Sequence, residues 1–264
     1  MGELGLKVNF KKRIKEINFY ISQIPDEIPS TKNKERIDSY IRVSIILLCS
    51  HFEGALKDII ETFIKDINQL NIKCNDLDTR LYAKNLFSNP NTKLKDINNV
   101  INVLNNYKTA LNKSEIITLN YEYFNNTESN PTPEIIIKMF RIFGYDNIID
   151  LLNSEINNLA PSYEQSDFFK ESEKEQLRSF LSNRTIKRIS NILEKSRPNK
   201  KQVYKYGFYK HINDLLLARH KIVHGDSDFK LTRQAVIELK HEIFKLLCAL
   251  YKKLNKNLVT MKCN

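Results

Sequence analysis

Apolar residues recur three and four positions apart along most of this chain, which is the spacing of one face of an α-helix. The longest series covers residues 35–70 and predicts a long central helix. Shorter series predict helices at about 7–23, 78–88, 95–112, 133–143, 146–159, 169–182, 207–224 and 232–256. No stretch alternates apolar and polar residues over more than a few positions. The expected fold class is therefore all-α, an antiparallel helical bundle with a long central helix and a C-terminal helix pair.

Three of these helices carry recognisable end signals. Thr132 is a candidate N-terminal cap, Pro133 suits the first helical position, and Gly144 is placed to end the same helix. Gly225 is a C-terminal cap for the helix at 207–224, and Thr232 is the expected N-cap of the last helix. With only 6 glycines and 7 prolines in 264 residues, long helices are favoured over turn-rich β-structure.

The charge of the chain indicates what it binds. The formal net charge is +11, and a protein this basic is attracted to polyanions such as RNA. The alternative is that the charge serves solubility alone.

The cysteines and the N-terminus bear on metals and location. None of the 4 cysteines forms a C-x-x-C pair, so no structural zinc site is expected. Cys49 and Cys248 lie in apolar stretches and are expected to be buried thiols, as in a reducing compartment. The N-terminus lacks the apolar core of a signal peptide, and the run Val43–Cys49 is too short to span a bilayer. We expect a cytoplasmic protein without membrane contact.

The segment "DLLLARHKIVHGDSD", residues 214–228, holds the candidate chemistry. It places Arg219, His220 and His224 at the end of a predicted helix, in a chain with 5 histidines. Histidine gives and takes protons near neutral pH, and the planar arginine fork matches two phosphate oxygens. These groups suffice for metal-independent RNA cleavage by the substrate's own 2′-hydroxyl. No cofactor is required.

The spacing of these three residues sets a geometric condition. His220 and His224 are four residues apart and share a helix face. Arg219 and His224 point about 140° apart at about 100° per residue. The length of the arginine side chain, loosening near Gly225 or a second copy across a two-fold axis would bring them together. The alternative is that the three side chains only cap carbonyls at a helix end.

Two separated motifs resemble the HEPN superfamily, the higher eukaryotes and prokaryotes nucleotide-binding domains. "ARHKIVHGD" is similar to that family's pattern of Arg, a polar residue, a few apolar residues and His. The helix "IILLCSHFEGALKDII" resembles the one that carries h-x-E-G in a bacterial subfamily of toxin-like and defence-associated nucleases, with His51, Glu53 and Gly54 at the matching positions. The pattern favours Asn or Asp at position 220, so which histidine is the acid and which the base is open; His224 is the preferred catalytic histidine.

The resemblance implies one HEPN-like helical domain over 1–264, with a helical insertion at about 72–200. It implies a metal-independent endoribonuclease of toxin–antitoxin or phage-defence type, which leaves a 2′,3′-cyclic phosphate and dimerises through its motif helices. A cognate antitoxin or defence-system protein is the expected further partner. Glu53 is expected to orient Arg219 or a histidine, with a solvated face or a structural salt bridge as alternatives. His51 is expected to be structural, and Gly54 to permit close helix approach.

The stretch "RPNKKQVYKYGFYKH" leads directly into the motif helix and mixes cations with aromatic rings, as single-stranded RNA binding requires. The candidate RNA-binding residues are Lys200, Lys201, Lys205, Tyr206 and Lys210. Two other functions stay open. One is a HEPN module that binds RNA or nucleotide without cutting it, and the other is a helical adaptor or antitoxin.

Overall fold

In the computed structural model the protein is described over residues 2–25, 34–88, 97–125, 127, 130–155, 207–226 and 231–263. Over these ranges it forms eight α-helices, one short 3-10 helix and one isolated bridge between Lys73 and Ile116. The predicted all-α fold class is confirmed. The predicted helix at 169–182 lies outside the described residues, and the single domain with an insertion at about 72–200 stays a prediction.

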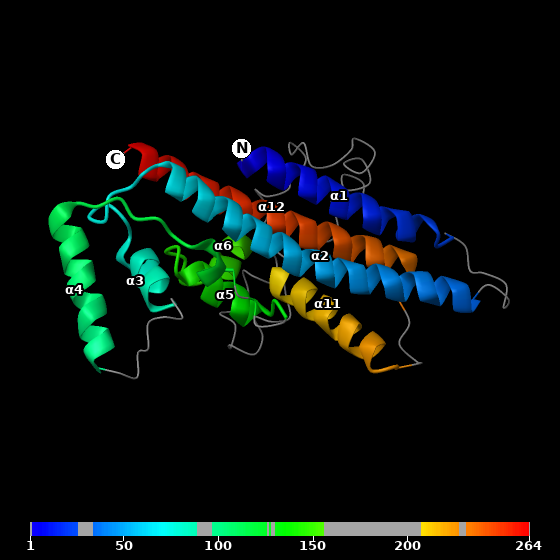
Figure 1. Ribbon diagram of the computed structural model, residues 1–264. Coiled ribbons are helices and arrows are strands. Elements are labelled where there is room, and N and C mark those ends of the chain that lie inside the picture. Colours follow the sequence, from blue (N-terminus) through cyan, green and yellow to red (C-terminus); the bar gives the residue numbers. More distant parts are fainter. Residues whose placement is uncertain are drawn as a thin grey trace.

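Three long helices run side by side through the molecule: α1 (Gly2–Ser22), α2 (Lys34–Gln69) and α12 (Arg233–Cys263) (Figure 1). The central helix α2 runs antiparallel to α1, and it also contacts α11 (Gly207–Val223). The pair formed by α11 and α12 follows the predicted C-terminal arrangement, with α11 antiparallel to α2 (Figure 1).

Shorter elements lie between α2 and α11 in the sequence. They are α3 (Thr79–Phe87), α4 (Ile97–Lys113), the 3-10 helix η2 (Tyr121–Tyr123), α5 (Pro133–Arg141) and α6 (Ile148–Ser154). Of these, η2 contacts α2, α5 contacts α11, and α6 contacts both α11 and α12. In Figure 1, α3 and α4 lie toward the end of the bundle where α2 finishes. The segment before α5 is therefore held close to the motif helix.

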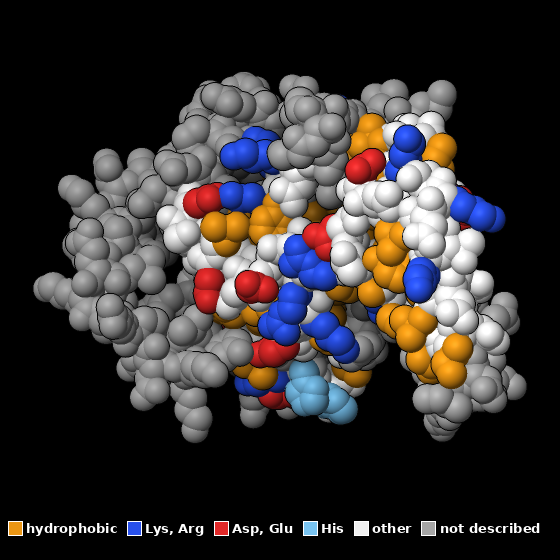
Figure 2. Space-filling model, turned by 90° about the vertical axis from the view of Figure 1, so that its left-hand side faces the viewer, with side chains coloured by type: hydrophobic (Ala, Val, Ile, Leu, Met, Phe, Trp, Pro, Cys, Tyr) orange, Lys and Arg blue, Asp and Glu red, His pale blue; other side chains and the backbone are white. Residues whose placement is uncertain are grey.

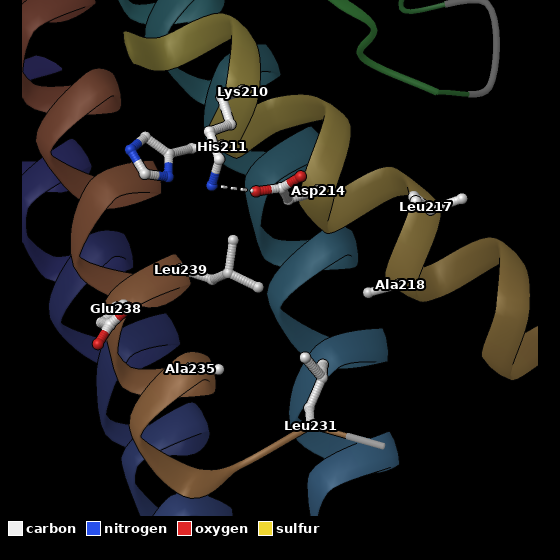
Figure 3. A pocket seen from close by; sticks show the side chains of 9 residues that line it. All are labelled: Lys210, His211, Asp214, Leu217, Ala218, Leu231, Ala235, Glu238 and Leu239. Carbon is white, nitrogen blue, oxygen red and sulfur yellow. Dashed lines mark hydrogen bonds and ion pairs between the residues drawn. The ribbon is translucent and has the colours of Figure 1, made fainter. Parts of the chain in front are cut away.

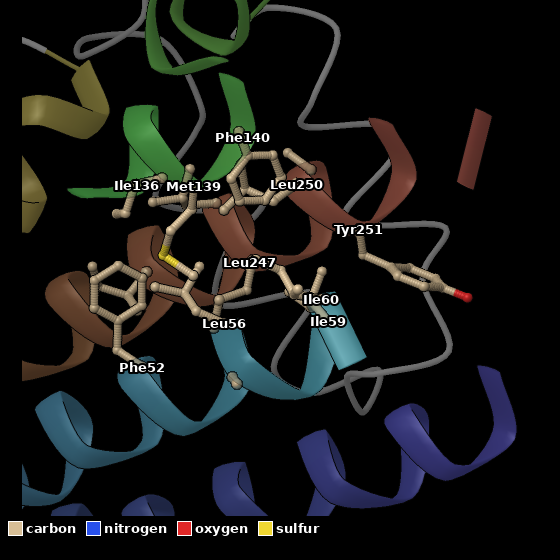
Figure 4. Packing of buried hydrophobic residues seen from close by; sticks show 14 of the residues in the cluster. Phe52, Leu56, Ile59, Ile60, Ile136, Met139, Phe140, Leu247, Leu250 and Tyr251 are labelled. Atoms are coloured by element: carbon tan, nitrogen blue, oxygen red, sulfur yellow. The ribbon is translucent and has the colours of Figure 1, made fainter. Parts of the chain in front are cut away.

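The apolar stripes of the helices meet in one buried cluster. Figure 4 shows Phe52 and Leu56 of α2, Phe140 of α5 and Leu247 of α12 packed together. All four side chains are almost completely excluded from water. Because burying such a side chain stabilises a fold by about 1.5–3 kcal/mol, this cluster fixes how α2, α5 and α12 sit against one another.

The end signals read from the sequence operate as expected. The Thr132 hydroxyl accepts a hydrogen bond from the Ile135 amide at 3.4 Å, and the Thr232 hydroxyl accepts one from the Ala235 amide at 3.2 Å. Gly144 and Gly225 take left-handed backbone φ values of 92° and 74°, which favour glycine. Helix α12 runs to Cys263, beyond the predicted end at 256, because no glycine or proline follows Leu254 and Leu258 is still buried.

Candidate active site

Arg219 continues the buried stripe of α11. Phe208, Ile212 and Leu215 are fully buried, and Arg219 follows them at the next helical repeat. Its guanidinium Nη1 donates a hydrogen bond to the Asn130 side-chain oxygen at 2.5 Å. Asn130 lies in the segment that leads into α5, so this bond connects the motif helix to an element far away in the sequence. Arg219 is thus half-buried, directed inward and fixed in place.

The two motif histidines point the other way. His220 and His224 are both exposed, and their ring centroids lie 4.2 Å apart at an interplanar angle of 53°. The predicted common face is therefore present. The chain's other histidines are buried or half-buried. In Figure 2 histidine side chains lie at the lower edge of one face, next to a group of Lys and Arg side chains.

The backbone around His224 is tightly fixed. The Gly225 amide donates to the Ile222 carbonyl at 3.2 Å, and the Asp226 amide donates to the Lys221 carbonyl at 3.0 Å. These two bonds are the Schellman arrangement of a glycine-capped helix end. The Asp226 carbonyl also accepts a hydrogen bond from Arg42 of α2 at 3.0 Å. The end of α11 is therefore anchored to α2, and its histidines stand on a rigid support.

A sulfur atom links the middle of α11 to α2. The Cys49 thiol donates to the Leu215 carbonyl at 3.7 Å, one turn before Arg219. Burial raises the pKa of Cys49 to about 12, although the positive charge of Arg219 acts in the opposite direction. Burial likewise raises the pKa of Cys248 to about 12. Both were predicted to be buried thiols, and both are. A thiol with so high a pKa is a packing group rather than a nucleophile.

Glu53 is held by Lys57 and Thr127. Its carboxylate accepts hydrogen bonds from the Lys57 ammonium at 2.7 Å and from the buried Thr127 hydroxyl at 2.8 Å. Burial raises the pKa of Glu53, but these two hydrogen bonds and the charges of Lys57 and Arg219 outweigh it and hold the pKa below its ordinary value. Arg219 therefore lies within the electrostatic reach of Glu53, while its hydrogen bond goes to Asn130.

The two sides of the "SHFEG" segment contact different parts of the molecule. Glu53 faces the segment around Thr127, whereas His51 and Gly54 face α1. A side-chain carbon added at Gly54 would lie 2.6 Å from Nη1 of Arg13. The Arg13 guanidinium occupies that notch and donates to Asp58 at 2.8 Å. The expected close approach at Gly54 is present, and the group that approaches is this guanidinium.

His51 forms part of the same contact. Its Nε2 lies 3.0 Å from a Glu16 carboxylate oxygen, and its Nδ1 lies 3.5 Å from Nη1 of Arg13. Burial lowers the pKa of His51, Glu16 partly opposes this, and Arg13 lowers the pKa further. These contacts join α1 to α2 and are what a structural histidine would make.

Only one of the expected RNA-binding residues belongs to the described part of the chain. Lys200, Lys201, Lys205 and Tyr206 lie outside the described residues. Lys210 is described; it is exposed and forms an ion pair with Asp214 at 2.9 Å. No three His, Cys, Asp or Glu side chains of the described ranges gather as a metal-binding group. No helix in those ranges is long and apolar enough to cross a membrane.

Sequence reasoning missed Asn130 and Thr127. Both belong to the segment "NNTESNP", which has no apolar periodicity and lies between the predicted helices at about 95–112 and 133–143. The signal that points to this segment is Pro131 and the capped start of α5, which fix where the loop ends. Nothing in the local sequence identifies Arg219 as the partner of Asn130, because Arg219 lies 89 positions away.

The family model described as RiboL-PSP-HEPN matches residues 8–256. No curated protein and no solved structure matches the chain. HEPN proteins are associated with RNase-type or RNA-related functions. The match spans nearly the whole sequence and includes both motif-bearing helices, so the chain belongs to the RiboL-PSP-HEPN family of the HEPN superfamily.

Proposed function

We propose that this protein is a metal-independent endoribonuclease that cleaves RNA through the substrate's 2′-hydroxyl. The observation that carries the proposal is the exposed pair His220 and His224, with ring centroids 4.2 Å apart, directly after the fixed cation Arg219. Two adjacent imidazoles supply one group that accepts a proton and one that donates a proton. The arginine supplies the positive charge that a phosphoryl transition state requires.

The reaction is an internal transfer at phosphorus. The 2′-oxygen forms a bond to the phosphorus while one histidine takes its proton. The bond from phosphorus to the 5′-oxygen breaks, and the other histidine protonates that oxygen. The products are a 2′,3′-cyclic phosphate and a free 5′-hydroxyl. Arg219 stabilises the negative charge on the non-bridging oxygens, and we assign proton transfer primarily to His224.

The orientation of these residues supports a site completed by a second copy. Arg219 points into the bundle and the histidines point outward, so a single copy presents them in different directions. Leu217 and Val223 lie on the solvent side of α11 with relative exposures of 54% and 61%. Apolar side chains beside a candidate site favour burial against another chain. A two-fold contact through α11 would cover them and pair the two motifs.

Cleavage of a single-stranded RNA by purified protein tests the catalytic assignment. His224→Ala should lower the rate by about two to four orders of magnitude, the usual effect of losing acid–base help. Arg219→Ala should also lower it strongly, and wild-type activity should persist in EDTA. Lys65→Ala is the control: it removes an exposed cation of α2 that belongs to neither motif, and it should cleave RNA at the wild-type rate. Undiminished cleavage by both motif variants would refute the assignment.

Light scattering tests whether the protein forms the proposed dimer. The wild type should be a dimer at micromolar concentration, and Val223→Asp should be monomeric and inactive because a charge cannot be buried in an apolar contact. Phe19→Asp is the matched control, since Phe19 is 60% exposed on α1. A wild-type protein that is fully monomeric and still active would contradict the proposal that two copies form the site.

The biological role is proposed from the resemblance of the "SHFEG" helix to toxin-like and defence-associated nucleases. Expression in bacteria should arrest growth for the wild type and not for His224→Ala, with cyclic phosphate on the RNA ends. Tight RNA binding without a cleavage product would instead assign a non-catalytic binding module. A stable heteromeric complex whose effect is insensitive to Arg219→Ala would assign an adaptor or antitoxin.

A further inference from the structure

Exposed apolar side chains are concentrated at α3 and α4, at the end of the bundle where α2 finishes (Figure 1). Over the described residues, eight large apolar side chains are exposed, and half of them belong to this part of the chain. They are Phe87, Ile101, Leu104 and Ile116, which are 40–56% exposed. Figure 2 faces this end of the molecule, and hydrophobic side chains lie on the surface of its right-hand part. Grouped apolar exposure of this kind is typical of an interaction surface.

The apolar arc of α4 is wider than the side that packs on α3. Tyr107 of α4 stacks on Tyr82 of α3, with ring centroids 4.6 Å apart. At about 100° per residue, Leu104 points about 60° and Ile101 about 120° away from Tyr107, in the same direction around the helix. Lys108 lies between these two positions. Ile101, Leu104 and Lys108 therefore form one exposed band along α4, here called the α4 stripe.

The α4 stripe is held in place by the segment that follows it. The Cys74 amide donates to the Glu115 carbonyl at 2.8 Å, and the Ile117 amide donates to the Ile72 carbonyl at 3.3 Å. These bonds join the end of α4 to the segment that follows α2. Because α4 is anchored both there and through Tyr107, its exposed side is a preformed surface, and binding to it costs little ordering.

The lysine of the α4 stripe lacks the acidic neighbour that lysines on other helices have. Three ion pairs join residues four apart on one helix: Lys57 with Glu53, Lys65 with Glu61, and Lys210 with Asp214. Figure 3 shows the last of these pairs, at the edge of a hollow between α11 and α12. In α4, by contrast, the residue four positions before Lys108 is Leu104, and the one four positions after it is Asn112. Lys108 forms no ion pair within the described residues.

The surroundings of the α4 stripe carry a net positive charge. Helices α3 and α4 contain no Asp or Glu, and their cations are Arg80, Lys84, Lys108 and Lys113. Asp78 pairs with the first of these at 2.7 Å, and Glu115 pairs with the last at 3.9 Å. Within the described part of the chain, Lys84 and Lys108 are left without a carboxylate partner. A complementary partner therefore supplies carboxylates beside an apolar surface.

We propose that the α4 stripe binds an acidic amphipathic helix of a partner protein. The apolar side of that helix lies on Ile101 and Leu104, and its carboxylates lie opposite Lys84 and Lys108. The stripe extends about 10 Å along α4, or about two helical turns, which accommodates two successive apolar anchors of a helix. The partner is thus distinct from RNA, which the proposed site on α11 binds.

Two other occupants fit the α4 stripe less well. A second copy of this chain would bring Lys84 and Lys108 against the same cations, and like charges across a contact repel. RNA bases stack on aromatic rings, whereas the apolar side chains of the stripe, Ile101 and Leu104, are aliphatic. Apolar contact combined with carboxylates meets both features of the surface.

Fluorescence anisotropy of labelled peptides with the full-length protein tests this surface. The first probe is a peptide of about 20 residues, long enough to be helical alone, with leucines three and four positions apart and glutamates beside them. It should bind, and the same peptide with lysines in place of the glutamates should not. Leu104→Ser should weaken binding of the glutamate peptide about ten-fold, because an apolar contact is lost. Val43→Ser is the matched control: Val43 is 38% exposed on α2, and this variant should bind like the wild type.

A charge reversal tests the second part of the proposal. Lys108→Glu should bind the lysine peptide better than the glutamate peptide, which reverses the preference of the wild type. Thermal unfolding of each variant should match that of the wild type, because the substituted side chains are exposed.

The proposal would be overturned by equal binding of the two peptides, by no measurable binding of the glutamate peptide, or by undiminished binding to Leu104→Ser. Loss of RNA binding or of binding to anionic phospholipid vesicles in Leu104→Ser would assign the α4 stripe to those ligands instead. A lower molar mass of Leu104→Ser in light scattering would assign it to a second copy. None of these measurements involves RNA cleavage, so their failure is distinct from failure of the proposed nuclease function.

Discussion

At the scale of single residues, the feature that sets this site apart is the hydrogen bond from Arg219 to Asn130. A guanidinium that is half-buried needs partners for its donors, and a neutral amide oxygen satisfies one without cancelling the charge. A carboxylate in the same place would compete with the phosphate for the arginine. Asn130 therefore suits the proposed role of Arg219 as a cation that binds the RNA phosphate.

Asn130→Ala should lower the cleavage rate by about ten-fold, because Arg219 loses the partner that fixes its direction. A hydrogen bond to a charged group contributes about 1.5–3 kcal/mol, and only part of this affects the transition state. Cleavage kinetics and thermal unfolding measure the two effects separately. In an Arg219→Ala background the same substitution should have no further effect on the rate. An additive loss in the double variant would show that Asn130 acts through something other than Arg219.

At the scale of helices, the Arg13 guanidinium of α1 packs against Gly54 of α2. Glycine in a helix interior is destabilising by roughly 1 kcal/mol relative to alanine, so its presence in α2 needs a compensating contact. That contact is the Arg13 guanidinium, which lies above Gly54 and binds Asp58. The pairing links the "SHFEG" motif to the packing of the bundle rather than to the site alone.

Gly54→Ala should destabilise the protein by less than about 1 kcal/mol, because the new methyl group would lie 2.6 Å from an Arg13 nitrogen and displace this side chain from Asp58, while the better helix propensity of alanine offsets part of the loss. The measurement is urea unfolding. In an Arg13→Ala background the sign should reverse, because the notch is then empty and alanine is the better helix former. Destabilisation of equal size in both backgrounds would show that another neighbour of Gly54 is responsible.

At the scale of the whole molecule, buried neutral histidines make folding sensitive to acid. His241 is buried in α12, and its Nε2 has no hydrogen-bond partner among the residues that the structure describes. Burial, together with the charges of Lys240 and Lys245, lowers its pKa to about 3. Burial also lowers the pKa of His51 and His211. The unfolded chain therefore binds more protons than the native protein once the pH falls below about 6.5.

The free energy of unfolding should fall as the pH is lowered from 7 to 5, a range above the titration of most carboxylates. His241 alone should contribute a slope of up to about 1.4 kcal/mol per pH unit below about 6.5. Urea unfolding at several pH values measures the slope. His241→Leu should flatten it without abolishing it, because His51 and His211 still contribute. A slope unaffected by that substitution would mean that His241 is not kept neutral.

Much of the fold follows from neighbouring residues. Helical spacing, the caps at Thr132 and Thr232 and the glycine at 225 are local signals, and they correctly predicted most helices in the described ranges. The proximity of His220 and His224 also follows from their spacing on a single helix.

Only the tertiary structure decided the remainder. The hydrogen bond to Asn130 sets the direction of Arg219, and it joins residues far apart in the sequence. The contact of the Arg13 guanidinium with Gly54 does the same. A helix period states which residues share a face, but not which other helix that face will meet. For that reason the sequence by itself determined the helices and the histidine pair, and long-range packing determined what surrounds them.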